Sequence, residues 1–118
     1  AKREDEHIRD IIAKCQQFAR NHQLVVWMVA HPHKLHRNDS GVIPPPDLYQ
    51  VSGSAHWANM ADVGLVVHRD FENNLTRIIT RKIREQGIYG HIGETYFSFS
   101  NTERVYEEIK EEDKELYQ

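Results

Sequence analysis

The sequence has 118 residues and a formal net charge of −3, with 39% hydrophobic and 28% charged residues. This length fits one domain or part of one, and the acidic balance excludes a protein whose overall charge attracts nucleic acid. Lys and Arg nevertheless gather in the middle of the chain, at Lys34–Arg37 and Arg77–Arg84. We therefore expect a local anion site. Cys15 is the only cysteine, which excludes a disulfide within the chain, and no apolar run approaches the ~18 residues of a membrane span.

The first half of the chain predicts a helix followed by a buried strand. Apolar residues recur at three- and four-residue steps over Glu4–His22, which is typical of an amphipathic helix. The next segment, Leu24–Ala30, carries no charge and is rich in β-branched residues, as in a strand buried inside a parallel sheet. His31 follows at the carboxyl end of this strand, where open α/β sheets bind ligands. A histidine hydrogen-bonded near a core strand is the alternative interpretation of His31.

The remaining segments predict a long polar loop, an irregular helix and four further strands. We expect one domain over residues 1–110 and an acidic tail over 111–118. In chain order the predicted elements are a loop at Pro32–Asp47 with three prolines, a short irregular helix within Asp47–Ala61, a buried strand at Val63–His68, a more exposed strand at Leu75–Ile83, a flexible glycine-containing loop at Gln86–Gly93, and a hairpin of Thr95–Ser100 with Arg104–Ile109.

Two groups of basic residues are candidates for anion binding. Lys34, His36 and Arg37 lie in the polar loop and suit contacts to a phosphate backbone, although a solvated loop explains them equally simply. Lys82 and Arg84 end a predicted strand, where two cations could reach a polyphosphate or, alternatively, protect a charged sheet edge from pairing.

The sequence does not contain a recognisable complete catalytic or metal-binding motif. No GxxxxGK[ST] phosphate loop, CxxC or HExxH occurs, so neither nucleotide hydrolysis by this chain alone nor a zinc site is predicted. The trio of His31, His33 and His36 leaves one alternative open. In this alternative the chain is a free-standing histidine-rich module that binds a metal or a small anion.

Three segments, taken in order, resemble the C-terminal half of a RecA-type hexameric replicative helicase. They are VVWMVAHPHK, PPPDLYQVSGSAHWANMADVGLVVHRD and RKIREQGIYGHIGETYFSF. The resemblance runs over about Glu4–Ile109 and is strongest to phage-type primase-helicases and the mitochondrial replicative helicase, within the wider DnaB-like superfamily.

The resemblance implies an α/β fold that is part of a RecA-like P-loop NTPase core, with helix-covered parallel strands followed by antiparallel strands. It also implies that the half carrying the P-loop, the catalytic glutamate and the Mg²⁺ ligands lies upstream of Ala1. The parent protein would then be an ATP-dependent or other NTP-dependent DNA helicase from a bacterial or phage-infected cytoplasm, and residues 1–118 alone would be inactive.

The resemblance also assigns roles to individual residues. His31 matches the γ-phosphate sensor, and Asn59 falls where relatives carry a glutamine near that phosphate. Lys82 and Arg84 match the lysine and arginine finger that reach the NTP of a neighbouring subunit in a hexameric or heptameric ring. The residues implied to contact single-stranded DNA are Lys34, His36, Arg37, Ser52 and Gly53. A non-motor RecA-like DNA-binding protein of the recombinase type is the rival within this fold.

Overall fold

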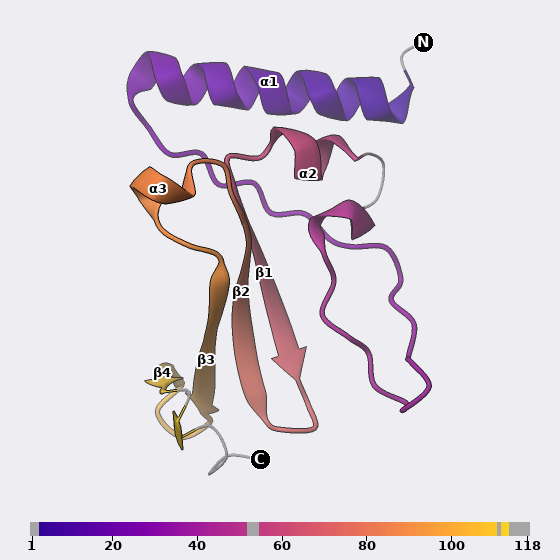
Figure 1. Ribbon diagram of the computed structural model, residues 1–118, viewed down its shortest axis with the longest axis vertical. Coiled ribbons are helices and arrows are strands. Elements are labelled where there is room, and N and C mark those ends of the chain that lie inside the picture. The colour runs from indigo at the N-terminus through magenta and orange to yellow at the C-terminus, as the bar shows by residue number, and fades with distance from the viewer. Residues whose placement is uncertain (1–2, 52–54, 111, 114–118) are drawn as a thin grey trace. The chain divides into compact units, whose positions relative to one another are not determined.

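The computed structural model describes residues 3–51, 55–110 and 112–113 and divides the chain into two compact units, Ala1–Asp62 and Val63–Gln118 (Figure 1). Each unit has its own internal contacts. A single domain over residues 1–110 stays a prediction, because compact units within a chain need not be separate domains.

The first unit begins with helix α1, Glu4–His22, whose bounds match the predicted helix. Acidic residues occupy its first turn and basic residues its last turn, which complements the helix dipole. The helix ends at Gln23, which adopts a left-handed conformation with φ 54°, and the Leu24 N–H donates to the Ala19 carbonyl at 2.9 Å. Ile12 is the buried residue of α1.

The structure contradicts the prediction of a buried strand at residues 24–30. No strand is assigned to them, and the side chains of Val25, Trp27 and Val29 are 79%, 77% and 89% exposed. A parallel strand is stable only when neighbouring strands satisfy its backbone groups and cover both faces. No strand pairs with this segment among the described residues, so the segment is apolar and exposed, and the parallel sheet is not observed.

The polar loop is closed at its base by backbone contacts. Pro32 and Val51 form an isolated antiparallel bridge, and the His33 N–H donates to the Gln50 carbonyl at 2.6 Å. The predicted irregular helix is two pieces, a 3-10 turn η1 at Leu48–Gln50 and helix α2 at His56–Met60. Helix α2 packs against α1, where the Gln16 side chain donates to the Met60 carbonyl at 2.6 Å. These contacts hold η1, α2 and the base of the loop within one unit.

The second unit is a four-stranded antiparallel sheet in the order β1-β2-β3-β4 (Figure 1). Its strands match the four predicted strands closely and are β1 Val63–Asp70, β2 Leu75–Ile83, β3 Gly93–Ser100 and β4 Val105–Ile109. The predicted glycine-containing loop holds a short helix, α3, at Gln86–Tyr89, whose first turn bonds to the Glu85 carbonyl.

Burial within this sheet reverses two predictions. β1 was expected to be buried, yet its residues alternate between buried and exposed, as in an antiparallel strand with one solvated face. β2 was expected to be the more exposed strand, yet it supplies Leu75, Thr76 and Ile79 to the core. β2 is the more buried strand because it is central in the sheet, with β1 on one side and β3 on the other.

Candidate functional site

The candidate DNA-contacting loop has an internally bonded tip. The Asn38 side-chain oxygen accepts the N–H groups of Ser40 and Val42 at 2.9 and 3.0 Å, and the Asn38 N–H donates to the Val42 carbonyl at 2.8 Å. Gly41 adopts φ +79°, a conformation that a side chain would strain. The Arg37 guanidinium donates to the Gly41 carbonyl at 2.6 Å. This turn therefore fixes the loop beyond its closed base.

Lys34, His36 and Arg37 lie together on this loop, and all three are exposed. The bond from Arg37 to Gly41 uses one of five guanidinium N–H donors, so the residue can brace the loop and still contact an anion. His31 lies one residue before the bridge at Pro32 and is exposed, and because residues 24–30 form no strand, it does not end a buried strand as predicted. The structure therefore places Lys34, His36 and Arg37 on the closed loop and His31 immediately before its base.

Asn59 lies on α2 in the same unit and is exposed. Its side-chain oxygen accepts a hydrogen bond at 3.3 Å from the hydroxyl of Tyr49, which lies on η1. The sequence interpretation did not include Tyr49, and an isolated tyrosine after a proline run gives no signal of a specific partner. Ser52 and Gly53, the two remaining candidate DNA contacts, lie outside the described residues.

Lys82 and Arg84 belong to the second unit. Lys82 is half-buried near the end of β2, where it pairs with Gly64 of β1, and Arg84 is exposed immediately beyond the strand. Lys82 therefore lies near the end of the central strand β2, and Arg84 follows that strand directly. Their assignment to a neighbouring nucleotide stays a prediction, and the described geometry defines only where they lie in this unit.

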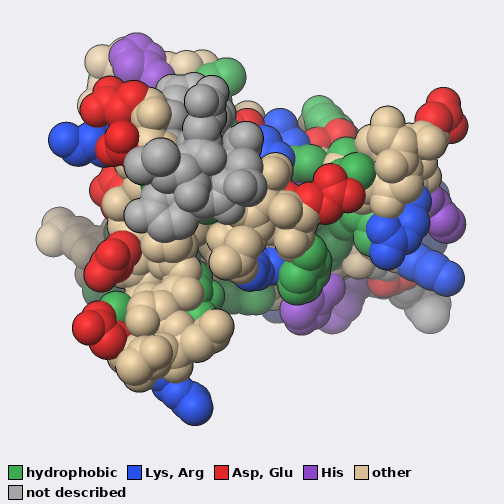
Figure 2. Space-filling model, turned by 90° about the horizontal axis from the view of Figure 1, so that it is seen from below, with side chains coloured by type: hydrophobic (Ala, Val, Ile, Leu, Met, Phe, Trp, Pro, Cys, Tyr) green, Lys and Arg blue, Asp and Glu red, His purple; other side chains and the backbone are tan. Residues whose placement is uncertain are grey.

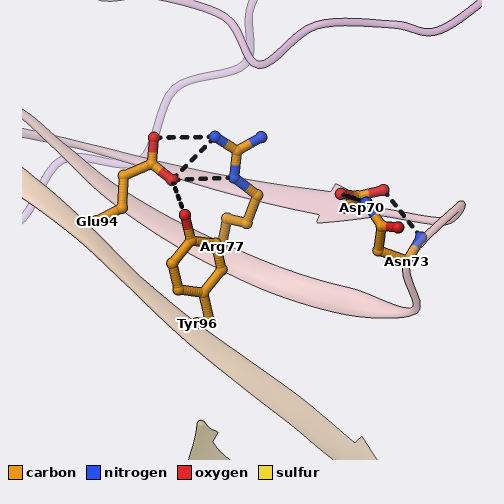
Figure 3. Close-up of polar contacts among 5 residues, drawn as sticks. All are labelled: Asp70, Asn73, Arg77, Glu94 and Tyr96. Atoms are coloured by element: carbon orange, nitrogen blue, oxygen red, sulfur yellow. Dashed lines mark hydrogen bonds and ion pairs between the residues drawn. The ribbon is translucent and has the colours of Figure 1, made fainter. Parts of the chain in front are cut away.

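Sequence reasoning missed a polar cluster formed by Arg77, Glu94 and Tyr96 on β2 and β3 (Figure 3). The Arg77 guanidinium donates to both Glu94 oxygens at 2.9 Å, and the Tyr96 hydroxyl donates to one of them at 2.9 Å. Burial raises the pKa of Glu94, but the hydrogen bonds from Tyr96 and Arg77 and the nearby cations outweigh burial and lower it. This cluster ties β2 to β3.

Two ionisable residues of β1 are also affected by their surroundings. Burial, followed by the positive charge of Arg77, lowers the pKa of His68, so the neutral imidazole is favoured. Burial also opposes the charge of Asp70, but hydrogen bonds from Asn73 outweigh it and lower the pKa of that carboxyl group. The hydrogen bonds from Asn73 to Asp70 stabilise the turn between β1 and β2, and neither His68 nor Asp70 was singled out from the sequence.

The described residues hold no group of three or more His, Cys, Asp or Glu side chains that could bind a metal ion. The metal-binding alternative therefore has no ligand cluster in this part of the chain. On the face drawn in Figure 2, Lys and Arg side chains lie in several separate groups among acidic ones. No described helix is both long enough and apolar enough to cross a membrane.

Comparison with known proteins gives one significant relative. The chain is 37% identical over 108 residues to the Twinkle homolog protein, chloroplastic/mitochondrial, of Arabidopsis thaliana. The matched region covers 87% of this chain and 15% of that protein, so the chain spans about one seventh of the relative's length. No protein-family model matches the chain. The chain is therefore similar to one segment of a Twinkle homolog.

Proposed function

We propose that this chain is the C-terminal part of the motor of a ring-shaped, NTP-dependent replicative DNA helicase. The observation that supports this proposal most strongly is the 37% identity to the Twinkle homolog over 87% of this chain. The parent protein would hydrolyse NTP at its subunit interfaces and move along single-stranded DNA. Its compartment would be the bacterial or phage-infected cytoplasm, although the relative's name places that protein in organelles.

The closed loop would contact the DNA backbone. Lys34, His36 and Arg37 are exposed on a loop whose base and tip are both held by hydrogen bonds. Because such a loop is already ordered, binding a phosphate backbone costs less conformational entropy than ordering a flexible segment. Ser52 and Gly53 are further proposed contacts. His31, next to the loop base, would sense the state of the nucleotide.

The nucleotide site would be shared between subunits. Asn59 would lie near the γ-phosphate, while Lys82 and Arg84 would reach the NTP of the neighbouring subunit. An arginine supplied in trans stabilises the charge that develops during phosphoryl transfer, and its rate contribution can be large. Other parts of the parent protein would supply the phosphate loop and the Mg²⁺ ligands, and Mg²⁺ would neutralise the phosphate charge when bound.

The trans role of Arg84 can be tested by mixing subunits. Arg84→Ala subunits of the full-length protein should recover NTP hydrolysis when they are mixed with subunits disabled in the phosphate loop, because some interfaces then join an intact phosphate loop to an intact Arg84. Arg20→Ala is the matched control, since Arg20 is exposed at the end of α1, and it should hydrolyse NTP without a partner. Mixed rings that stay as inactive as either variant alone would refute the trans role. A full-length protein that hydrolyses no NTP would favour the non-motor alternative.

A further inference from the structure

The 3-10 turn η1 is held in place from two sides. Within the turn, the Asp47 side chain accepts the Tyr49 N–H at 2.8 Å, and the Gln50 side chain accepts the Asp47 N–H at 2.8 Å. This reciprocal pair is a capping box, which fixes the backbone of a helical turn. From outside the turn, the Gln50 carbonyl accepts the His33 N–H. The turn is therefore joined directly to the base of the loop that carries Lys34.

Tyr49 connects the fixed turn η1 to Asn59 on α2. Its hydroxyl donates to the Asn59 side-chain oxygen, and η1 and α2 contact each other. An asparagine amide offers an oxygen that accepts and an NH₂ group that donates. With the Tyr49 hydroxyl donating to the oxygen, the NH₂ group lies on the side of the amide away from that contact. In that orientation the NH₂ group is the part of Asn59 that can donate to a phosphate oxygen.

We propose that Tyr49 is a positioning residue that orients the Asn59 amide for donation to the nucleotide and links it to the DNA-contacting loop. This inference rests on the proposed function, because it requires Asn59 to act at the γ-phosphate. The chain of contacts runs from His33 through the Gln50 carbonyl and the capped turn to Tyr49 and Asn59. DNA bound to the loop then acts on the same turn that holds the amide.

The link makes hydrolysis depend on DNA through a specific hydroxyl. Tyr49 is 63% exposed, so removing its hydroxyl leaves little buried surface disturbed. An interaction that acts on the reacting phosphate changes kcat more than the KM for NTP. Removal of the hydroxyl should therefore lower the kcat of DNA-stimulated hydrolysis and leave the KM for NTP and the affinity for single-stranded DNA nearly unchanged.

The test uses the full-length protein with ATP and a single-stranded oligonucleotide. Tyr49→Phe should lower kcat in the presence of DNA by about 3- to 10-fold, which is the range expected for one neutral hydrogen bond. Asn59→Ala should lower kcat at least as much. The double variant should be no slower than Asn59→Ala alone, because Tyr49 acts through Asn59. Tyr106→Phe is the matched control, since Tyr106 is 60% exposed on β4, and its kcat should equal that of the wild type.

The outcomes distinguish the positioning role of Tyr49 from the proposed function of the chain. If Asn59→Ala is slow but Tyr49→Phe hydrolyses ATP normally, or if the two losses add in the double variant, the positioning role is wrong and the proposed function stands. If Asn59→Ala has normal kcat, the role of Asn59 is wrong and the inference about Tyr49 is wrong with it. A Tyr49→Phe protein that melts at a lower temperature, with KM and DNA affinity also impaired, would show a merely structural role and overturn the proposal.

Discussion

Val29 offers a direct test of whether the extended apolar segment belongs to a larger sheet. Its side chain is 89% exposed in the structure of residues 1–118. Exposed substitutions away from special features usually change stability by less than about 0.5 kcal/mol, so Val29→Ala should have almost no effect in this chain alone. In the full-length protein, the proposed RecA-like sheet would bury residues 24–30 between neighbouring strands, and the same substitution should then be costly.

The magnitude follows from the atoms that the substitution removes. Val29→Ala deletes two methyl groups, which contribute about 0.8 kcal/mol each when fully buried. The cavity left behind adds to this transfer term, so the expected loss is about 2 kcal/mol in the full-length protein. Expressed as local opening, this corresponds to a roughly 30-fold increase in the fraction of time for which the segment is open.

Hydrogen–deuterium exchange of the peptide spanning residues 24–30 measures this opening directly. We expect rapid exchange in residues 1–118 with or without the substitution, slow exchange in the full-length protein, and accelerated exchange in full-length Val29→Ala. Val105→Ala is the matched control, because Val105 is 44% exposed on the observed strand β4 and should respond similarly in both proteins. Equal, rapid exchange of the peptide in both wild-type proteins would refute the idea that further strands cover this segment.

Three further predictions address the loop and the sheet. Lys34→Ala in the full-length protein should reduce the slope of log affinity against log salt for single-stranded DNA by about 0.7, and an unchanged slope would remove Lys34 from the proposed contacts. Glu94→Gln should destabilise the sheet by about 1 kcal/mol in urea unfolding, because the neutral amide loses the charge-assisted bonds from Arg77, and equal stability would contradict a structural role for this pair. Stability should also fall with pH, because the lowered pKa values of His68 and Glu94 mean that the unfolded chain binds more protons. The His68 contribution should be present above about pH 6.5 and fade as the pH falls through its folded pKa, so a urea midpoint that stays constant between about pH 7 and 5 would contradict the His68 assignment. The Glu94 contribution should be present above about pH 4.3 and fade as the pH falls through its lower folded pKa, so a midpoint that stays constant between about pH 5 and 3 would contradict the Glu94 assignment.

Elements whose stabilising contacts are local could be predicted from the sequence. Helix α1 has a complete apolar stripe and suitable charges at its ends, and its observed bounds equal the predicted ones. The hairpin of β1 and β2 has a turn-forming Glu72-Asn73-Asn74 sequence between two runs rich in β-branched residues, and both strands were located correctly. In each case the sequence pattern and its partner lie within one short stretch of chain.

Features that depend on distant partners were not predictable in the same way. Residues 24–30 have the composition of a buried strand, but burial requires neighbouring strands, and composition alone does not provide them. The relative exposure of β1 and β2 depends on strand order, which alternating polarity does not specify. The Tyr49–Asn59 contact joins residues ten positions apart through the fold of η1 and α2, so neither residue reveals its partner in the sequence. The roles of the candidate site residues stay predictions.

The backbone bridge between Pro32 and Val51 has a consequence for how this region can be altered. Because the two ends of the loop are already joined, the entropy of closing it grows only with the logarithm of its length, by about 0.6 kcal/mol for each doubling. Residues inserted after Val42, outside the hydrogen-bonded turn of Asn38–Val42, would therefore lengthen the loop at a small thermodynamic cost and leave the bridge at its base in place. The reach of this loop is a property that variation or engineering can adjust separately from the stability of the unit that supports it.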